Sequence, residues 1–265
     1  MEKQNKPIAI VGIGCRFPGE ASTPEKFWDL MVNKKDAIVN VPKDRWDQRS
    51  FYDASEKKTG KMRVMQGGFL KEGVKNFDPL FFGISPVEAE DLDPQQSLLL
   101  EVTYEALEDC GMTMDSIKGS KTGVFVGGFT IDNYIAKASQ ESKHLIKSHT
   151  SLGSPLTMLS NKISYCFDLR GPSITIDTAC SSSLVATHYA CQSIWNGESE
   201  MALVGGVNAM LSPEIFVLMS QGKFLSKHGR CKSFDSDAGG YVRGEGGGVV
   251  VLKSYEQAIK DGDRI

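Results

Sequence analysis

Cys180 stands where a buried strand is predicted to turn directly into a helix. In the segment GPSITIDTACSSSLVATHYACQSIWNG (residues 171–197), the apolar run Ile174–Asp177 is typical of a strand. Apolar residues then recur at helical spacing, at Leu184, Cys191 and Ile194. Free backbone N–H groups and the helix dipole at such a turn favour the thiolate, which is the nucleophilic form of cysteine. The same N–H groups can hydrogen-bond the oxyanion that forms when a thioester carbonyl is attacked.

The neighbours of Cys180 are small, which suits the approach of an acyl group. Ala179, Ser181 and Ser182 leave room there, as the nucleophile turn of serine hydrolases does. The other interpretation of Cys180 is a small buried hydrophobic residue, which describes most free cysteines. We keep that interpretation for four cysteines that lie inside predicted strands or on apolar helix faces: Cys15, Cys110, Cys166 and Cys191.

Alternating strands and helices must position this turn. Short apolar runs bounded by glycine predict buried strands at Ile8–Ile13, Gly123–Gly127, Ile174–Asp177, Ala202–Val207 and Gly248–Leu252. Helical patterns lie between several of them, so the order of elements indicates α/β layering. Residues 40–80 have weaker periodicity, and we expect an irregular excursion there.

The clearest helical pattern follows Asp93. Asp93 is a suitable N-cap, Pro94 fits the first turn, and Gln96 is placed to reach back as in a capping box. The helix should end at Gly111. One face carries the apolar residues Leu98, Leu99, Val102, Ala106 and Cys110, and the other carries Glu101, Glu105 and Glu108. This spacing predicts a helix that packs on a sheet.

Composition excludes several classes of protein. With 265 residues, 40% hydrophobic and 24% charged, the chain can bury a sizeable core and is not mainly disordered. Its 30 basic and 33 acidic residues give a formal charge of −3, so we expect no nucleic-acid partner. Six scattered cysteines without a CxxC pair predict no metal site and no disulfide scaffold, and no apolar run could span a membrane. We therefore expect a reducing, cytoplasmic location.

Five stretches carry a family resemblance. DTACSSSL around Cys180 resembles the active-site signature of β-ketoacyl synthases, and the chain is similar to the ketosynthase domain of type I polyketide synthases. The matching stretches are PIAIVGIGCRFPG at 7–19, VPKDRWD at 41–47, FDPLFFGISPVEAEDLDPQQSLLLEVTYEALED at 77–109, NKISYCFDLRGPSITIDTACSSSL at 161–184 and GRCKSFDSDAGGYVRGEGGGVVVLK at 229–253. Departures from the usual pattern are mild: Leu92, Ser97, Lys162 and Gly239.

The resemblance implies the N-terminal half of a thiolase-like layered α-β-α-β-α fold and a decarboxylative Claisen condensation. Cys180 would accept an acyl group from the phosphopantetheine arm of an acyl carrier protein, and a malonyl-type carrier thioester would supply the attacking enolate. The chain would bind no cofactor directly. The resemblance also implies a homodimer in which Arg170–Asp177 pairs across a two-fold axis, and it places Gly239–Gly246 near the active site. Within that stretch we expect a structural ion pair between Arg243 and Glu245.

The resemblance also shows what this sequence does not contain. The family uses two histidines, one in an HGTGT-like motif, and the four histidines here have other neighbours: His144, His149, His188 and His228. His188 lies eight residues after Cys180, about 12 Å along a helix, which is too far for a hydrogen bond with the thiol. We therefore expect residues 1–265 to be one incomplete domain that folds poorly alone and cannot complete condensation, although weak acylation of Cys180 could survive.

Three other functions remain as alternatives. A non-catalytic acyl-carrier-binding or dimerisation module would explain the missing histidines. A cysteine-dependent thioesterase would need a histidine close to Cys180. The run Gly12-Ile13-Gly14 after a strand resembles the start of a dinucleotide-binding fingerprint, but Phe17 replaces its third glycine and Pro18-Gly19 would disturb the helix that should follow.

Overall fold

The computed structural model describes residues 6–55, 58–74, 76–138, 143–144 and 146–265. A five-stranded sheet has the order β1-β7-β6-β4-β5. Its strands are β1 (Ile8–Arg16), β4 (Thr122–Gly127), β5 (Ser173–Ile176), β6 (Met201–Asn208) and β7 (Gly246–Ser254). β4 is parallel to β5 and to β6, whereas β7 is antiparallel to β6 and to β1. All five predicted strands and the α/β layering are confirmed.

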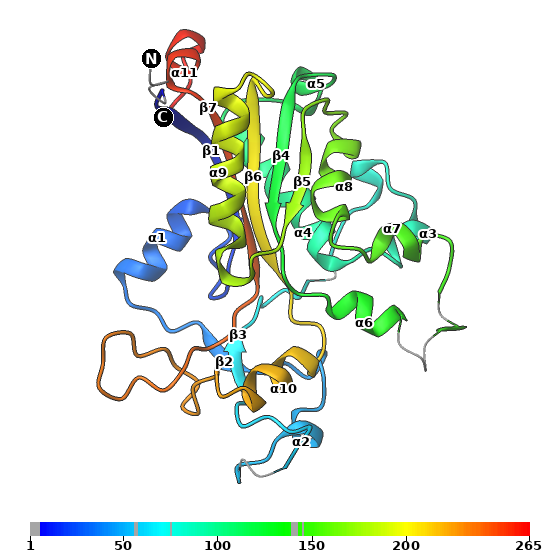
Figure 1. The fold of residues 1–265 in the computed structure, drawn as a ribbon, viewed down its shortest axis with the longest axis vertical. Coiled ribbons are helices and arrows are strands. Elements are labelled where there is room, and N and C mark those ends of the chain that lie inside the picture. Colours follow the sequence, from blue (N-terminus) through cyan, green and yellow to red (C-terminus); the bar gives the residue numbers. More distant parts are fainter. Residues whose placement is uncertain (1–5, 56–57, 75, 139–142, 145) are drawn as a thin grey trace.

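Helices cover both faces of this sheet (Figure 1). The helices of the described residues are α1 (Pro24–Val32), α2 (Gln48–Phe51), α3 (Pro86–Ala89), α4 (Pro94–Asp109), α5 (Met114–Ile117), α6 (Asp132–Ala138), α7 (Thr150–Gly153), α8 (Met158–Cys166), α9 (Ser182–Trp195), α10 (Glu214–Gln221) and α11 (Tyr255–Asp261), of which α2 and α10 lie below the sheet. α9 lies in front of β6 in Figure 1, α4 lies behind the sheet, and α8 lies beside β5 and contacts α4. No helix among the described residues is long and apolar enough to cross a membrane.

Each face of the sheet has its own apolar core. On the α4 side, Leu99 and Val102 pack with Val124 and Leu203 of the strands. The α9 side is built from Phe125, Ala186, Ala190, Ala202, Val204 and Leu252. Alternate residues of one strand thus enter different cores, as the two-residue period of a strand requires.

α4 begins as predicted but is capped differently. The Asp93 carboxylate accepts a hydrogen bond from Gln95 N at 2.9 Å, and the Gln95 side-chain amide donates to the same carboxylate at 3.1 Å. The expected capping box with Gln96 is therefore wrong. The Gln96 amide instead donates to the Gly153 carbonyl at 3.0 Å, because the chain before α8 lies against this end of the helix.

Two glycines let α4 lie directly on β1. A Cβ atom on Gly12 would lie 2.3 Å from the Ala106 carbonyl oxygen, and one on Gly14 would lie 2.1 Å from that of Val102. Both glycines are inside β1, and the next helix begins only at Pro24. These glycines therefore serve helix-on-strand packing and do not open a phosphate-binding turn.

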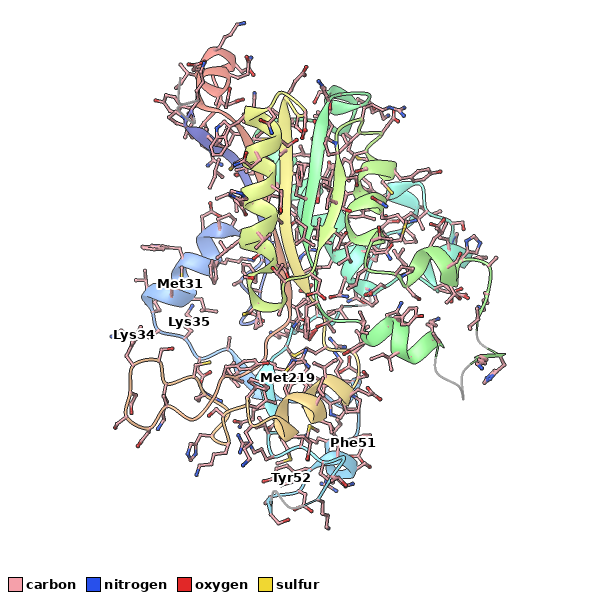
Figure 2. All side chains as sticks on the ribbon, in the orientation of Figure 1. Met31, Lys34, Lys35, Phe51, Tyr52 and Met219 are labelled. Atoms are coloured by element: carbon pink, nitrogen blue, oxygen red, sulfur yellow. The ribbon has the colours of Figure 1, made fainter. Side chains whose placement is uncertain are left out.

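A second, smaller core lies below the sheet in Figure 1. The predicted irregular excursion contains the antiparallel pair β2 (Ile38–Asn40) and β3 (Gln66–Gly68). Its core combines residues from this segment and from around α10: Val41, Trp46, Met62, Val64, Phe69, Met210, Phe216 and Leu225. Phe51 and Met219, labelled in Figure 2, pack at its edge. Segments far apart in sequence thus order a region with weak local periodicity.

Candidate active site around Cys180

The predicted strand-to-helix turn is confirmed. β5 ends at Ile176, a short 3-10 helix spans Ala179–Ser181, and α9 follows without a gap. Cys180 lies in the 3-10 helix and is exposed to solvent. Ala179 has a φ of 55°, a left-handed conformation that costs a residue with a side chain on the order of 1–3 kcal/mol. The turn therefore presents the thiol on a strained backbone.

Serine side chains hold this turn together. The Ser182 hydroxyl accepts a hydrogen bond from Thr178 N at 2.9 Å and donates to the Ala179 carbonyl at 2.7 Å. Ser181 is the N-cap of α9, but its hydroxyl donates to the Thr178 carbonyl at 2.9 Å and makes no side-chain cap. The 3-10 helix in front of α9 already accepts N–H groups here: Ser182 N donates to the Ala179 carbonyl, and Ser181 N donates to the Thr178 carbonyl at 3.4 Å. The serine hydroxyls and these backbone bonds together fix the shape of the turn that carries Cys180.

Two glycines at strand ends allow α9 to begin directly on the sheet. A Cβ atom on Gly127, the last residue of β4, would lie 2.4 Å from Ser183 N. One on Gly206 in β6 would lie 2.9 Å from the Ser183 Cβ atom. Both glycines lie in predicted strands, but their role in seating α9 was not predicted. Their signal was present as Gly127-Gly128 and Gly205-Gly206, two glycine pairs that follow apolar runs.

Tyr241 is a residue that the sequence analysis did not single out. Its backbone is held by hydrogen bonds from Tyr241 N to the Phe224 carbonyl at 2.9 Å and from Ser226 N to the Tyr241 carbonyl at 2.8 Å. Burial raises the pKa of the Tyr241 phenol, the Arg243 cation lowers it, and a negative charge on Cys180 raises it. Tyr241 belongs to the Gly239–Gly246 stretch, whose place near the active site stays a prediction.

The remaining cysteines separate into two groups. Burial raises the thiol pKa of Cys15, Cys110, Cys166 and Cys191, to about 11 for Cys166. A thiol with a raised pKa is a poor nucleophile at neutral pH, so their interpretation as packed residues is confirmed. Cys231 is exposed like Cys180, and its sulfur accepts a hydrogen bond from Val242 N at 3.3 Å.

Comparison with known proteins identifies the family. Residues 5–258 match the family described as "Beta-ketoacyl synthase, N-terminal domain". The chain belongs to this family. It is 50% identical over 259 residues to "Probable polyketide synthase 1" of Dictyostelium discoideum, covering 97% of this chain and 8% of that protein. It is 47% identical over 259 residues to "Highly reducing polyketide synthase cla2" of Cladosporium cladosporioides, covering 98% of this chain and 11% of that protein.

Solved ketosynthase structures have the same fold. The oxazolomycin ketosynthase domain from Streptomyces albus superposes with a TM-score of 0.91 at 40% identity, covering 98% of this chain and 44% of that one. The ketosynthase from module 6 of the bacillaene synthase of Bacillus subtilis gives a TM-score of 0.85 at 39% identity, covering 97% of this chain and 42% of that one. The thiolase-like fold is therefore confirmed, and the chain spans less than half of these ketosynthases. The matches favour neither an oxidoreductase nor a non-catalytic module.

No histidine joins Cys180 in the described part of this ketosynthase chain. His188 is exposed on α9, with its ring 5.6 Å from that of Tyr189 in an edge-on arrangement. His228 N donates to the Ser226 hydroxyl at 3.3 Å. Among the described residues, no hydrogen bond connects a histidine to Cys180, and no group of three His, Cys, Asp or Glu side chains could hold a metal ion. The sulfur is thus present without a neighbouring general base.

The expected ion pair between Arg243 and Glu245 is wrong. The buried Glu245 carboxylate pairs with Arg45 at 3.1 Å and also accepts a hydrogen bond from Leu70 N at 3.3 Å. Arg243 lies over the Phe216 ring, with 4.9 Å between its guanidinium carbon and the ring centre. Arg45 comes from a part of the ketosynthase sequence 200 residues earlier, so only the folded chain shows which arginine reaches Glu245.

A cleft of about 1100 Å³ lies away from Cys180, between β1, α1 and α4. Arg16 on its wall pairs with Glu101 at 2.6 Å and with Glu105. Each of these charged side chains thus has a partner of opposite charge, and the ion pairs connect β1 to α4. We assign the cleft no part in the chemistry of the ketosynthase site.

Proposed function

We propose that this chain carries the nucleophile of a ketosynthase that extends acyl chains by decarboxylative Claisen condensation in a polyketide or fatty acid synthase. The observation that carries the proposal is Cys180, exposed on a strained turn where β5 passes into α9. The polyketide synthase relatives and the solved ketosynthases support it. A cysteine nucleophile suits condensation because a thioester keeps its carbonyl electrophilic toward a carbon nucleophile.

The acylation step follows from the geometry of the turn. The Cys180 thiolate attacks the thioester carbonyl of an acyl group on the phosphopantetheine arm of a carrier protein. A new S–C bond forms, and in our proposal backbone N–H groups close to the sulfur stabilise the resulting oxyanion. The old C–S bond then breaks, and the carrier thiol leaves after taking up a proton. Phosphopantetheine therefore belongs to the partner, and this chain binds no cofactor in our proposal.

The condensation step completes the proposed reaction. A malonyl-type carrier thioester loses carbon dioxide, and the resulting enolate attacks the Cys180 thioester to release a β-ketoacyl carrier protein. Since this chain spans 44% and 42% of the two solved ketosynthases, we propose that the groups promoting decarboxylation belong to the remaining part of such a domain. Residues 1–265 are then an N-terminal portion that acylates weakly and does not condense.

We further propose a homodimer that uses the free edge of the sheet. β5 is an edge strand that pairs only with β4 among the described strands, and Ile174 on it is 43% exposed. An unpaired strand edge is suited to association with a second copy, and a two-fold axis places the same edge on both sides. The reducing, cytoplasmic location stays a prediction, supported by six free cysteines.

Intact-mass measurement after incubation with a small acyl thioester tests the proposed acylation. We expect one added acyl group, located on Cys180 by peptide mapping and absent in Cys180→Ala. Cys231→Ala is the matched control, because Cys231 is the other exposed cysteine, and it should acylate like the parent chain. Equal labelling of both cysteines, or labelling that persists in Cys180→Ala, contradicts the proposed nucleophile.

A further inference from the structure

The backbone ladder between β4 and β6 ends at the two glycines that seat α9. These strands pair in parallel, and Gly127 with Gly206 is the last pair of their ladder. A Cβ atom on Gly127 would lie 2.4 Å from Ser183 N, and one on Gly206 would lie 2.9 Å from the Ser183 Cβ atom. The first turn of α9 therefore rests on both strand ends, at the point where their pairing stops.

Side chains join the loops that follow, residues 128–131 after β4 and 209–213 after β6. The Gln95 amide, in the first turn of α4, donates to the Thr130 carbonyl at 2.9 Å, and its oxygen accepts a hydrogen bond from Ala209 N at 3.3 Å. Thr130 and Ala209 each lie three residues beyond the last ladder pair. The Thr130 hydroxyl also donates to the side-chain oxygen of Asn208. One amide of α4 thus bonds with both loops.

This bridge is buried and fixed at its base. Gln95 is 1% exposed, Thr130 0% and Ala209 1%. The Asp93 carboxylate, which caps α4, accepts a second hydrogen bond from the Gln95 amide at 3.1 Å and so holds the side chain in place. Without Gln95, a buried carbonyl and a buried N–H group would each lose a partner that water cannot easily replace. The bridge is therefore a strong constraint on the distance between the two loops.

We propose that Gln95 is a positioning residue for the nucleophile: its amide holds the loops after β4 and β6 together and so fixes the strand ends on which the Cys180 turn rests. Gln95 acts through Gly127 and Gly206 on Ser183, which lies three residues after Cys180. The inference rests on the proposed role of Cys180 as the nucleophile. Hydrogen exchange needs no acyl transfer, so it tests the bridge separately from the proposed function.

Gln96 is the matched control. It is the next residue of α4 and is also 1% exposed. Its amide donates to the Gly153 carbonyl at 3.0 Å and to the Leu152 carbonyl at 3.3 Å, both in α7 and in neither loop. Gln95→Met and Gln96→Met therefore remove amides of the same size from the same helical turn. Both should lower the melting temperature, and only Gln95→Met should affect the turn at Cys180.

The first measurement is hydrogen exchange followed by mass spectrometry. In peptides that cover residues 178–184, Gln95→Met should speed exchange about tenfold over the parent, since the loss of buried hydrogen bonds raises the population of the locally open state. Gln96→Met should exchange there at the parent rate. Exchange at the turn that is unchanged in Gln95→Met, or equally fast in both variants, would overturn the bridge.

The second measurement compares two reactions of Cys180 in a Cys231→Ala background. Acylation by a small thioester should slow about tenfold in Gln95→Met, because the sulfur and the groups that stabilise the oxyanion lose their relative position. Alkylation by iodoacetamide forms no oxyanion and should keep the parent rate. Gln96→Met should match the parent in both reactions. Parent-like acylation by a Gln95→Met chain with faster exchange at the turn would overturn the positioning role.

Thr130→Val replaces Gln95→Met if that variant does not fold. It keeps the shape of the side chain and the carbonyl that Gln95 contacts, but it removes the hydroxyl that donates to Asn208. We expect a smaller change of the same sign in exchange and in acylation, and parent-like values of both would overturn the proposal. If the parent chain itself is not acylated, the proposed function fails, and exchange at residues 178–184 alone decides whether the bridge holds the turn.

Discussion

Gly127→Ala tests whether the sheet positions the nucleophile. The added Cβ atom would lie 2.4 Å from Ser183 N and 2.6 Å from Ser182 C, whereas ordinary contacts begin at 3.4 Å. Since these are backbone atoms of the first turn of α9, the helix start must move by about 1 Å, and misplacing reacting groups by that distance can cost about 10²-fold in rate. Overpacking costs about 1–3 kcal/mol, which predicts a fall in melting temperature of about 2–6 °C for a chain of this length.

The assay for Gly127→Ala is the rate of Cys180 acylation by a small thioester, with thermal unfolding recorded on the same samples. Gly239→Ala is the control, since a Cβ atom there meets only the Asp237 carbonyl at 3.8 Å and its φ is not positive. We expect this control to match the parent in both measurements. Acylation of folded Gly127→Ala at the parent rate would refute the idea that close contact with β4 sets the position of Cys180.

Other substitutions probe the packing, the buried charges and the dimer. Gly14→Ala should lower the melting temperature but leave iodoacetamide labelling of Cys180 unchanged in the folded fraction, because its Cβ atom would meet the Val102 carbonyl at 2.1 Å, far from the nucleophile turn. Burial raises the pKa of Asp93 to about 6, so its protonated form stabilises the fold below about pH 4, and this contribution is lost as the pH rises through 6. The free energy of unfolding of Asp93→Asn, measured in urea relative to that of the parent, should therefore rise by up to about 3 kcal/mol from about pH 4 to pH 7. A difference between the two proteins that does not change with pH counts against this. Ile174→Lys should shift any dimer to monomer in analytical ultracentrifugation, and an unchanged dimer excludes the β5 edge.

The features predicted correctly from sequence are those with local signals. The five strands are apolar runs bounded by glycine, and α4 carries its own cap at Asp93 and its own stop at Gly111, which has a φ of 72°. The turn at Cys180 was predictable for the same reason, because strand, small residues and helix are contiguous. The capping box failed because Gln96 bonds with Gly153, whose position depends on tertiary packing.

The features missed from sequence depend on contacts between distant segments. Arg45 reaches Glu245 across 200 residues, and Trp46 packs on Phe216 with 5.3 Å between ring centres. Spacing along the chain carries no information about which partner is nearer in space. The backbone of Tyr241 is held in the same way by distant residues, since its loop returns beside Phe224 and Ser226.

The strained turn at Cys180 is held in place by hydrogen bonds within the turn and by packing against the sheet. Ala179 adopts a left-handed backbone and Ser181 leaves α9 uncapped, and both choices lower stability. The Ser182 hydroxyl offsets part of this cost with two hydrogen bonds inside the turn. Gly127 has no side chain, so the first turn of α9 packs directly against the end of β4. The fold thus tolerates a strained backbone at a turn that keeps the Cys180 thiol exposed, which a packing role for Cys180 would not require.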